Sequence, residues 1–188
     1  MLRKFLLVAL VFISGWTSAY ADEKPLTVDQ VKRFAASLPA LNALGAEFEE
    51  EGKIENLRIA NKPVEGEVFQ PYTNAVAMLS EKYPADLKRL EAAVKPHGFK
   101  TKEWGHIGDR VMVAYLALKM EEEDPDSMAM MEGFDKSMLD MVPPEMHAQL
   151  QQTFLMLETV KNAPEADKKI VAEVKPELDK VIDTDKPS

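Results

Sequence analysis

The segment from Thr101 to Glu123 constrains the fold more than any other part of the 188-residue chain, because it is apolar on nearly every side. Its apolar residues recur at helical spacing and form two stripes: Trp104, Ile107, Val111, Tyr115 and Leu118 on one, and Met112, Leu116 and Met120 on the other. Thr101 is a good N-cap. We therefore predict one helix over residues 101–123, with a solvent-exposed first half and a buried second half. A helix that is apolar all round needs other helices around it, so the sequence predicts a bundle with this helix at its centre.

Single apolar stripes at helical spacing predict the surrounding helices. The first and last residues of these stripes are Val31 and Phe48, Phe69 and Tyr83, Leu87 and Val94, Met128 and Met141, Met146 and Val160, and Ile170 and Val181. Thr27 and Gln30 predict a capping box at the first helix. We expect a kink or restart at Pro39 and a bend at Pro176, since proline removes a helix hydrogen bond. Residues 53–68 show no sustained period and predict a loop or short turn. The fold class is therefore all-α, a single-domain bundle of six or seven helices.

Two short similarities accompany these patterns. The run Leu26-Thr27-x-x-Gln30 is similar to the Leu-Thr-x-x-Gln element of small helical stress chaperones of the periplasm. Those chaperones carry the element twice and are not strongly acidic, so we assign no family. Residues 84–96 and 164–176 share six identities over 13 aligned positions. Duplication of a helical hairpin would explain this match, but a shared helix-forming composition explains it almost as well, and we favour composition.

The first 21 residues have the three parts of a secretory signal peptide: Arg3 and Lys4, the apolar run 5–13, and Ala19-Tyr20-Ala21. Nine apolar residues are too few for a membrane anchor, which needs about 20. We predict cleavage after Ala21, which leaves a mature chain of residues 22–188 in the periplasm or, alternatively, secreted. Its longest apolar run has eight residues, so we expect no membrane span.

Composition excludes several classes of function. The chain has no cysteine, which removes disulfides, thiol chemistry and a lipid anchor on cysteine. Its formal net charge is −9, so nucleic acid and anionic lipid are expected to repel it. Known catalytic and nucleotide-binding motifs are missing from the sequence, and only three histidines are present. We therefore predict a protein without catalytic activity and without a cofactor.

The first half of the 101–123 segment contains the candidate polar site: Glu103, His106, Asp109 and Arg110. Glu103-x-x-His106 has the spacing of a di-iron motif, but such centres need a second copy of that motif, and the sequence has none. Gly105 and Gly108 each cost roughly 1 kcal/mol relative to alanine within a helix. Either close approach of another helix or a ligand notch lined by backbone must compensate.

Nine of the eleven methionines lie between residues 112 and 156. Thioethers are suitable ligands for Cu(I), and an exported protein could handle copper. Most of these methionines lie at core spacing, and flexible methionines also suit an apolar groove that accepts a partner helix or an unfolded chain. The candidate partner surface is Met128, Met131, Met138 and Met141. We rank a protein- or peptide-binding, chaperone-like role first, a periplasmic Cu(I)-binding protein that uses the Met-rich segment 112–156 second, and an enzyme last.

Overall fold

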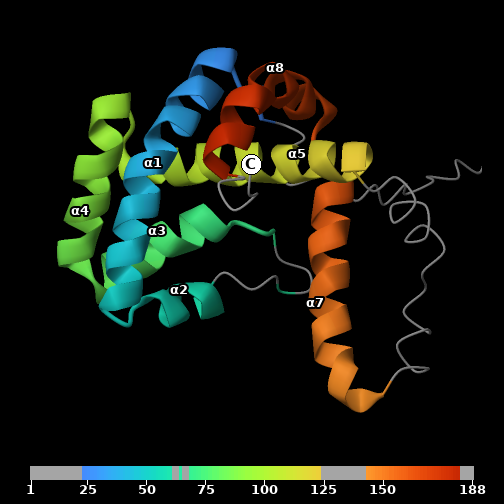
Figure 1. Cartoon of the computed structure of the whole chain (residues 1–188), viewed down its shortest axis with the longest axis horizontal. Coiled ribbons are helices and arrows are strands. Elements are labelled where there is room, and N and C mark those ends of the chain that lie inside the picture. Colours follow the sequence, from blue (N-terminus) through green and yellow to red (C-terminus); the bar gives the residue numbers. More distant parts are fainter. Residues whose placement is uncertain (1–22, 61–63, 65–67, 124–142, 183–188) are drawn as a thin grey trace, which may run out of the picture.

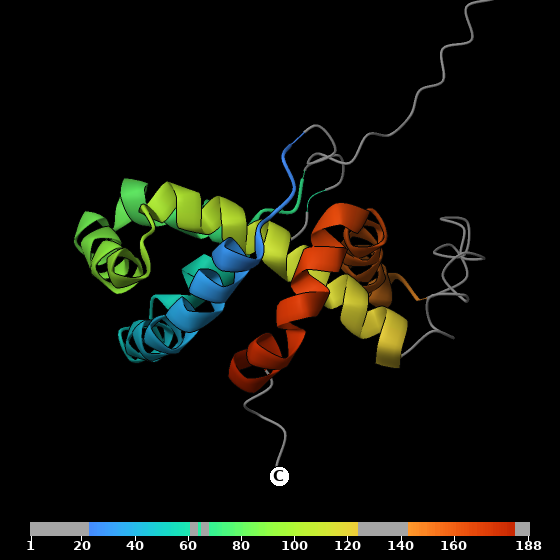
Figure 2. The same cartoon turned by 90° about the horizontal axis from the view of Figure 1, so that it is seen from above.

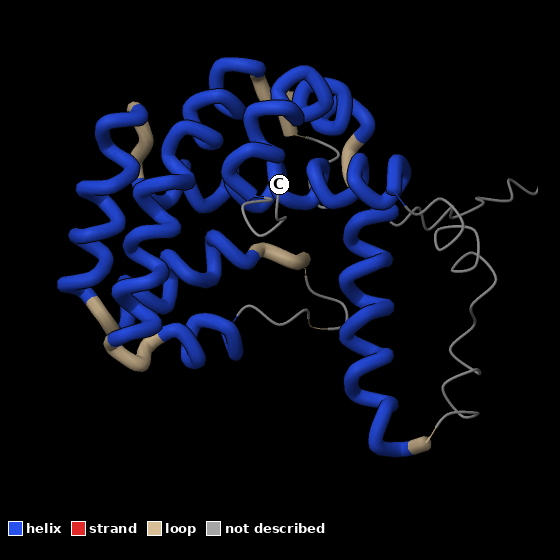
Figure 3. Tube along the Cα trace, viewed as in Figure 1, coloured by secondary structure: helices blue, strands red, loops and turns tan. Residues whose placement is uncertain are grey.

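The computed structural model describes residues 23–60, 64, 68–123 and 143–182, which form a single helical domain (Figure 1). Within these ranges there are seven α-helices, one 3-10 turn and no strand (Figure 3). The helices are α1 (Val28–Glu50), α2 (Ile54–Ala60), α3 (Pro71–Lys82), α4 (Pro84–Val94), α5 (Thr101–Glu123), α7 (Pro144–Lys161) and α8 (Glu165–Ile182), and the turn is η1 (Lys95–His97). The all-α prediction is confirmed.

Three predicted features lie outside the described residues. They are the signal peptide at 1–21, the predicted helix that begins near residue 124, and the candidate partner surface of Met128, Met131, Met138 and Met141. These three predictions therefore remain predictions.

Local sequence explains where the first helices begin and end. The Thr27 hydroxyl accepts a hydrogen bond from Gln30 N at 3.2 Å, and Thr27 N donates to Gln30 Oε1 at 3.0 Å, so the capping box is confirmed. Helix α1 then runs unbroken through Pro39, and no restart occurs there. The helix ends before Gly52, whose φ of +70° favours glycine.

Helix α2 corrects the predicted loop at residues 53–68. Leu57 is buried in the main core and Ile54 packs against that core. Tertiary packing of apolar residues such as these can stabilise a helix that is too short to form alone. Seven residues are too few to show a sustained apolar period in the sequence, which is why the prediction was wrong.

Helix α5 runs across the molecule and contacts α1, α3, α4, α7 and α8 (Figure 1). Helices α1 and α8 pack together and lie on the same side of α5 (Figure 2). Helix α7 joins the far end of α5 through a separate small core made of Phe69, Val113, Ala117, Val160 and Ala163.

The first half of α5 is more buried than predicted, while Val111, Ala114 and Tyr115 in the second half are buried. In the first half, Trp104, Asp109 and Arg110 are buried. In the second half, the stripe of Met112, Leu116 and Met120 is only half-buried. The α5 helix therefore has the predicted bounds, but burial on every side is not confirmed. The half-buried apolar stripe is available to line a groove.

The two glycines of α5 allow α3 to approach closely. A Cβ on Gly105 would lie 3.3 Å from backbone atoms of Tyr72 and Thr73. A Cβ on Gly108 would lie 2.7 Å from Phe34 Cε2 and 3.0 Å from Tyr72 Cγ. Close helix packing, rather than a ligand notch, therefore accounts for both glycines.

Candidate functional site

Arg110 is the centre of a buried polar network. Its Nε and Nη2 donate to the two carboxylate oxygens of Asp167, each at 2.8 Å. Nη2 also donates to the Lys24 carbonyl at 2.9 Å, and Nη1 donates to Glu23 Oε2 at 3.1 Å. Asp167 Oδ1 accepts a further bond from Leu26 N at 2.9 Å. The network thus fastens residues 23–26 onto α5 and α8, which is a structural role.

Asp109 faces α3, whereas Arg110 faces α8, and Asp109 caps the N-terminus of α3. Its Oδ1 accepts from Tyr72 N at 2.7 Å, and its Oδ2 accepts from Thr73 N at 3.2 Å. The N-cap residue of α3, Gln70, makes no side-chain capping bond, so Asp109 supplies the cap from another helix. Burial raises the pKa of Asp109 to about 6, although hydrogen bonds from Thr73 and Tyr72 oppose the shift. Burial, together with the charge of Asp109, also raises the pKa of Tyr72.

The candidate polar site therefore does not converge on one point. His106 Nε2 lies 2.7 Å from Glu23 Oε2, so Glu23 joins His106 to Arg110. Asp109 faces α3, and Glu103 is exposed. In the part of the chain that the structure describes, no three His, Asp or Glu side chains are grouped to hold a metal ion. Sequence reasoning missed Glu23 and Asp167, because their roles depend on contacts more than 50 residues away.

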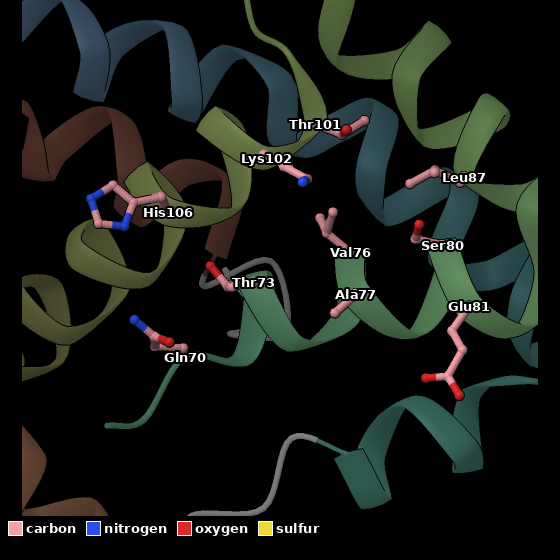
Figure 4. Close-up of a pocket in the computed structure, with 10 residues that line it drawn as sticks. All are labelled: Gln70, Thr73, Val76, Ala77, Ser80, Glu81, Leu87, Thr101, Lys102 and His106. Carbon is pink, nitrogen blue, oxygen red and sulfur yellow. The ribbon is translucent and has the colours of Figure 1, made fainter. Parts of the chain in front are cut away.

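A polar pocket of about 550 Å³ lies on the outer side of the α3–α5 contact (Figure 4). Thr101, Lys102 and His106 of α5 form one wall of this polar pocket. The facing surface of α3 runs from Thr73 to Glu81. This pocket includes His106 but not the other three residues of the candidate polar site.

An apolar groove of about 530 Å³ lies among α1, α2, α3, α4, α5 and α7. Its walls include Leu41, Phe48, Leu57, Leu79, Leu116 and Met156, and none of its described lining residues carries a charge. Met112 and Leu116, two members of the half-buried stripe of α5, face this groove. The half-buried stripe of α5 therefore contributes to the wall of this groove.

No helix in the described ranges combines the length and the apolar character that crossing a bilayer requires. Comparison of the chain with protein-family models, with curated proteins and with solved structures finds no match. The polar pocket and the apolar groove are therefore the features of this chain that indicate a function.

Proposed function

We propose that the protein is an exported, non-catalytic binding protein whose apolar groove holds the apolar face of a partner's amphipathic helix. The observation that supports this most is the groove itself, which is about 530 Å³ in volume and has no charged residue among its described lining residues. Groups that enter it must therefore be apolar, because burying an unpaired charge or polar group is costly.

A helix fits this groove better than an extended chain does. The groove walls belong mainly to helices, whose backbone N–H and C=O groups bond within each helix. An extended peptide would bury its own backbone groups with few partners, at roughly 1–3 kcal/mol for each unsatisfied group. An amphipathic helix satisfies its backbone internally and presents apolar side chains at three- and four-residue spacing.

Charge favours a basic partner. The chain has a formal net charge of −9, and exposed Glu49, Glu50 and Glu55 lie near the α1–α2 end of the groove. The cations Lys53 and Arg89 at this end are already paired with Asp86. Lysines on the solvent side of the partner helix would complement this surface and speed association.

Methionine lets the groove adapt to its occupant. Met112 of α5 and Met156 of α7 both line it, and both side chains are half-buried. Unbranched thioether side chains can repack against different apolar surfaces. This supports the adaptable partner binding that the methionine-rich sequence suggested.

A synthetic 18-residue helix of leucine and lysine, with its leucines on one face, tests the groove. We expect saturable 1:1 binding by calorimetry, and none by a scrambled peptide of equal composition. Leu116→Asp should weaken binding at least tenfold, because it places a charge in the groove. The matched control is Val64→Asp, at an exposed apolar residue that does not line the groove. Equal binding of the scrambled peptide, or equal effects of the two substitutions, would refute the proposal.

Export rests on the N-terminal sequence and has its own test. If the signal peptide is cleaved after Ala21, the intact mass of protein from the periplasmic fraction should correspond to a chain that begins at Asp22. A mature pool that retains residues 1–21 would contradict export by this route.

A Cu(I)-binding role is the second candidate. The specific observation in its favour is that Met112 and Met156, from two different helices, line one groove. Soft thioether ligands suit Cu(I), but two of them make an incomplete set. We therefore place partner binding first.

A further inference from the structure

The polar pocket between α3 and α5 is built differently from the apolar groove. Its α3 surface consists of Thr73, Val76, Ala77, Ser80 and Glu81, which share one helix face at three- and four-residue spacing. Polar residues stand at both ends of this face and apolar residues occupy its middle. A volume of about 550 Å³ lies within the usual range for small-molecule sites.

Two opposite charges border this pocket. Lys102 of α5 and Glu81 of α3 are both exposed, and they lie on opposite rims, with Val76 and Ala77 between them (Figure 4). Neither takes part in an ion pair among the described residues, whereas Lys53, Lys168 and Lys175 do. One unpaired cation and one unpaired anion match a ligand that carries both charges.

The spacing along the helices sets the length of that ligand. Gly105 packs against Thr73, and the two helices run in opposite directions in Figure 4, so Lys102 lies roughly level with Val76. Glu81 is five residues further along α3, which is an offset of about 7.5 Å along the helix axis at 1.5 Å per residue. Extended peptides of two and three residues span at most about 7 Å and about 10 Å, which bracket this offset. A free amino acid spans at most about 3.6 Å, which is about half of this offset.

We infer that the polar pocket binds a short zwitterionic peptide of two or three residues, with its carboxylate at Lys102 and its ammonium group at Glu81. The Ser80 and Thr101 hydroxyls line the same space and can bond to the peptide group. Val76, Ala77 and Leu87 provide an apolar floor for one side chain of the ligand. This inference is independent of the apolar groove, because the two sites have no described lining residue in common.

The dipeptide Ala-Leu and two blocked analogues test the inference by calorimetry on the full mature chain. N-acetyl-Ala-Leu lacks the ammonium charge, and Ala-Leu amide lacks the carboxylate. We expect 1:1 binding of Ala-Leu, with affinity at least tenfold lower for each blocked analogue and for free leucine. Failure of Ala-Leu to bind, or equal affinity for all four probes, would overturn the inference.

Two substitutions identify which side chain binds the carboxylate of the peptide and which binds its ammonium group. Lys102→Gln should remove the preference for Ala-Leu over its amide but keep the preference over the acetylated form. Glu81→Gln should do the reverse, as expected for separate pairwise interactions. The matched control is Lys100→Gln, an exposed lysine outside the pocket, which should leave all affinities unchanged. Uniform weakening of every probe by both pocket substitutions would refute the assigned orientation.

Discussion

Arg110 and Asp167 form a buried, two-bond ion pair that joins α5 to α8, with both Nε–Oδ2 and Nη2–Oδ1 at 2.8 Å. The same guanidinium holds the Lys24 carbonyl, and the same carboxylate holds Leu26 N. Two charges and the backbone of residues 24–26 therefore depend on one contact. A buried pair of this kind contributes little relative to an apolar pair of similar volume, but losing one partner leaves an uncompensated charge.

We predict that Asp167→Asn lowers the free energy of unfolding by about 3–5 kcal/mol, because Arg110 remains buried without its anion. Asp29→Asn is the matched control, since Asp29 also pairs with an arginine but its side chain is 77% exposed, against 1% for Asp167. Exposed pairs contribute about 0–1 kcal/mol, so the control should change little. Urea denaturation measures both. Similar losses for the two variants would contradict the structural role of Arg110.

Asp109 should make stability depend on pH in the direction opposite to that of most carboxylates. Its pKa in the folded state is about 6, above the ordinary value of 3.8, so the folded state binds the proton more tightly. The stabilising contribution is therefore absent above pH 6 and grows as the pH falls from about 6 to about 4. Asp109→Asn removes this titration.

The measurement is the difference in unfolding free energy between wild type and Asp109→Asn at pH 7.5 and at pH 4.5. We expect the difference to move in favour of wild type at the lower pH. The comparison between variants cancels the contributions of other carboxylates. Asp86 is one of these, and a hydrogen bond from Lys53 lowers its pKa. A difference that is the same at both pH values would show that Asp109 does not titrate in this range.

Gly108→Ala should destabilise the protein although alanine favours helices. The new Cβ would lie 2.7 Å from Phe34 Cε2, in an aromatic cluster where the Phe34 and Tyr72 ring centroids are 5.6 Å apart. Overpacking typically costs about 1–3 kcal/mol, which exceeds the roughly 1 kcal/mol gain in helix propensity. Gly45→Ala in α1 has no atom within 4 Å of the new Cβ and should stabilise by about 0.5–1 kcal/mol. Thermal unfolding should separate the two variants in sign.

Much of the fold could be predicted from local sequence. The α5 bounds of 101–123 and the capping box at Thr27 follow from periodicity and capping chemistry, which depend on neighbouring residues only. Exposure along α5 could not be predicted, because Asp109 and Arg110 are buried by partners in α3, α8 and residues 23–24. A charged residue in a helix is predicted to be solvent-exposed as long as its distant partner is unknown, because charged residues are seldom buried without a partner.

The candidate sites show the same limit. The Glu103-x-x-His106 spacing identifies His106 as a candidate, but the contact of His106 with Glu23 spans 83 positions in the chain. Spacing identifies the stripe of Met112 and Leu116 as apolar. That the stripe lines a groove depends on where α1 and α7 lie in the fold. Spacing within one helix identifies a face, and it takes the other helices to determine what covers that face.

The methionines of the groove separate the two proposed functions. Replacing Met112 and Met156 by leucine keeps apolar volume and removes both sulfurs. If the groove binds helices, the double variant should keep its affinity for the leucine–lysine helix within about threefold, since packing rather than sulfur chemistry drives that binding.

Titration with Cu(I) against a competing chelator measures the alternative. We expect no stoichiometric site of picomolar affinity in wild type, because two thioethers lack the further ligand that tight binding of Cu(I) requires. Tight Cu(I) binding by wild type that is lost in the leucine variant would instead establish copper as the ligand. The same comparison for Met138→Leu with Met141→Leu extends the test to the methionines outside the described residues.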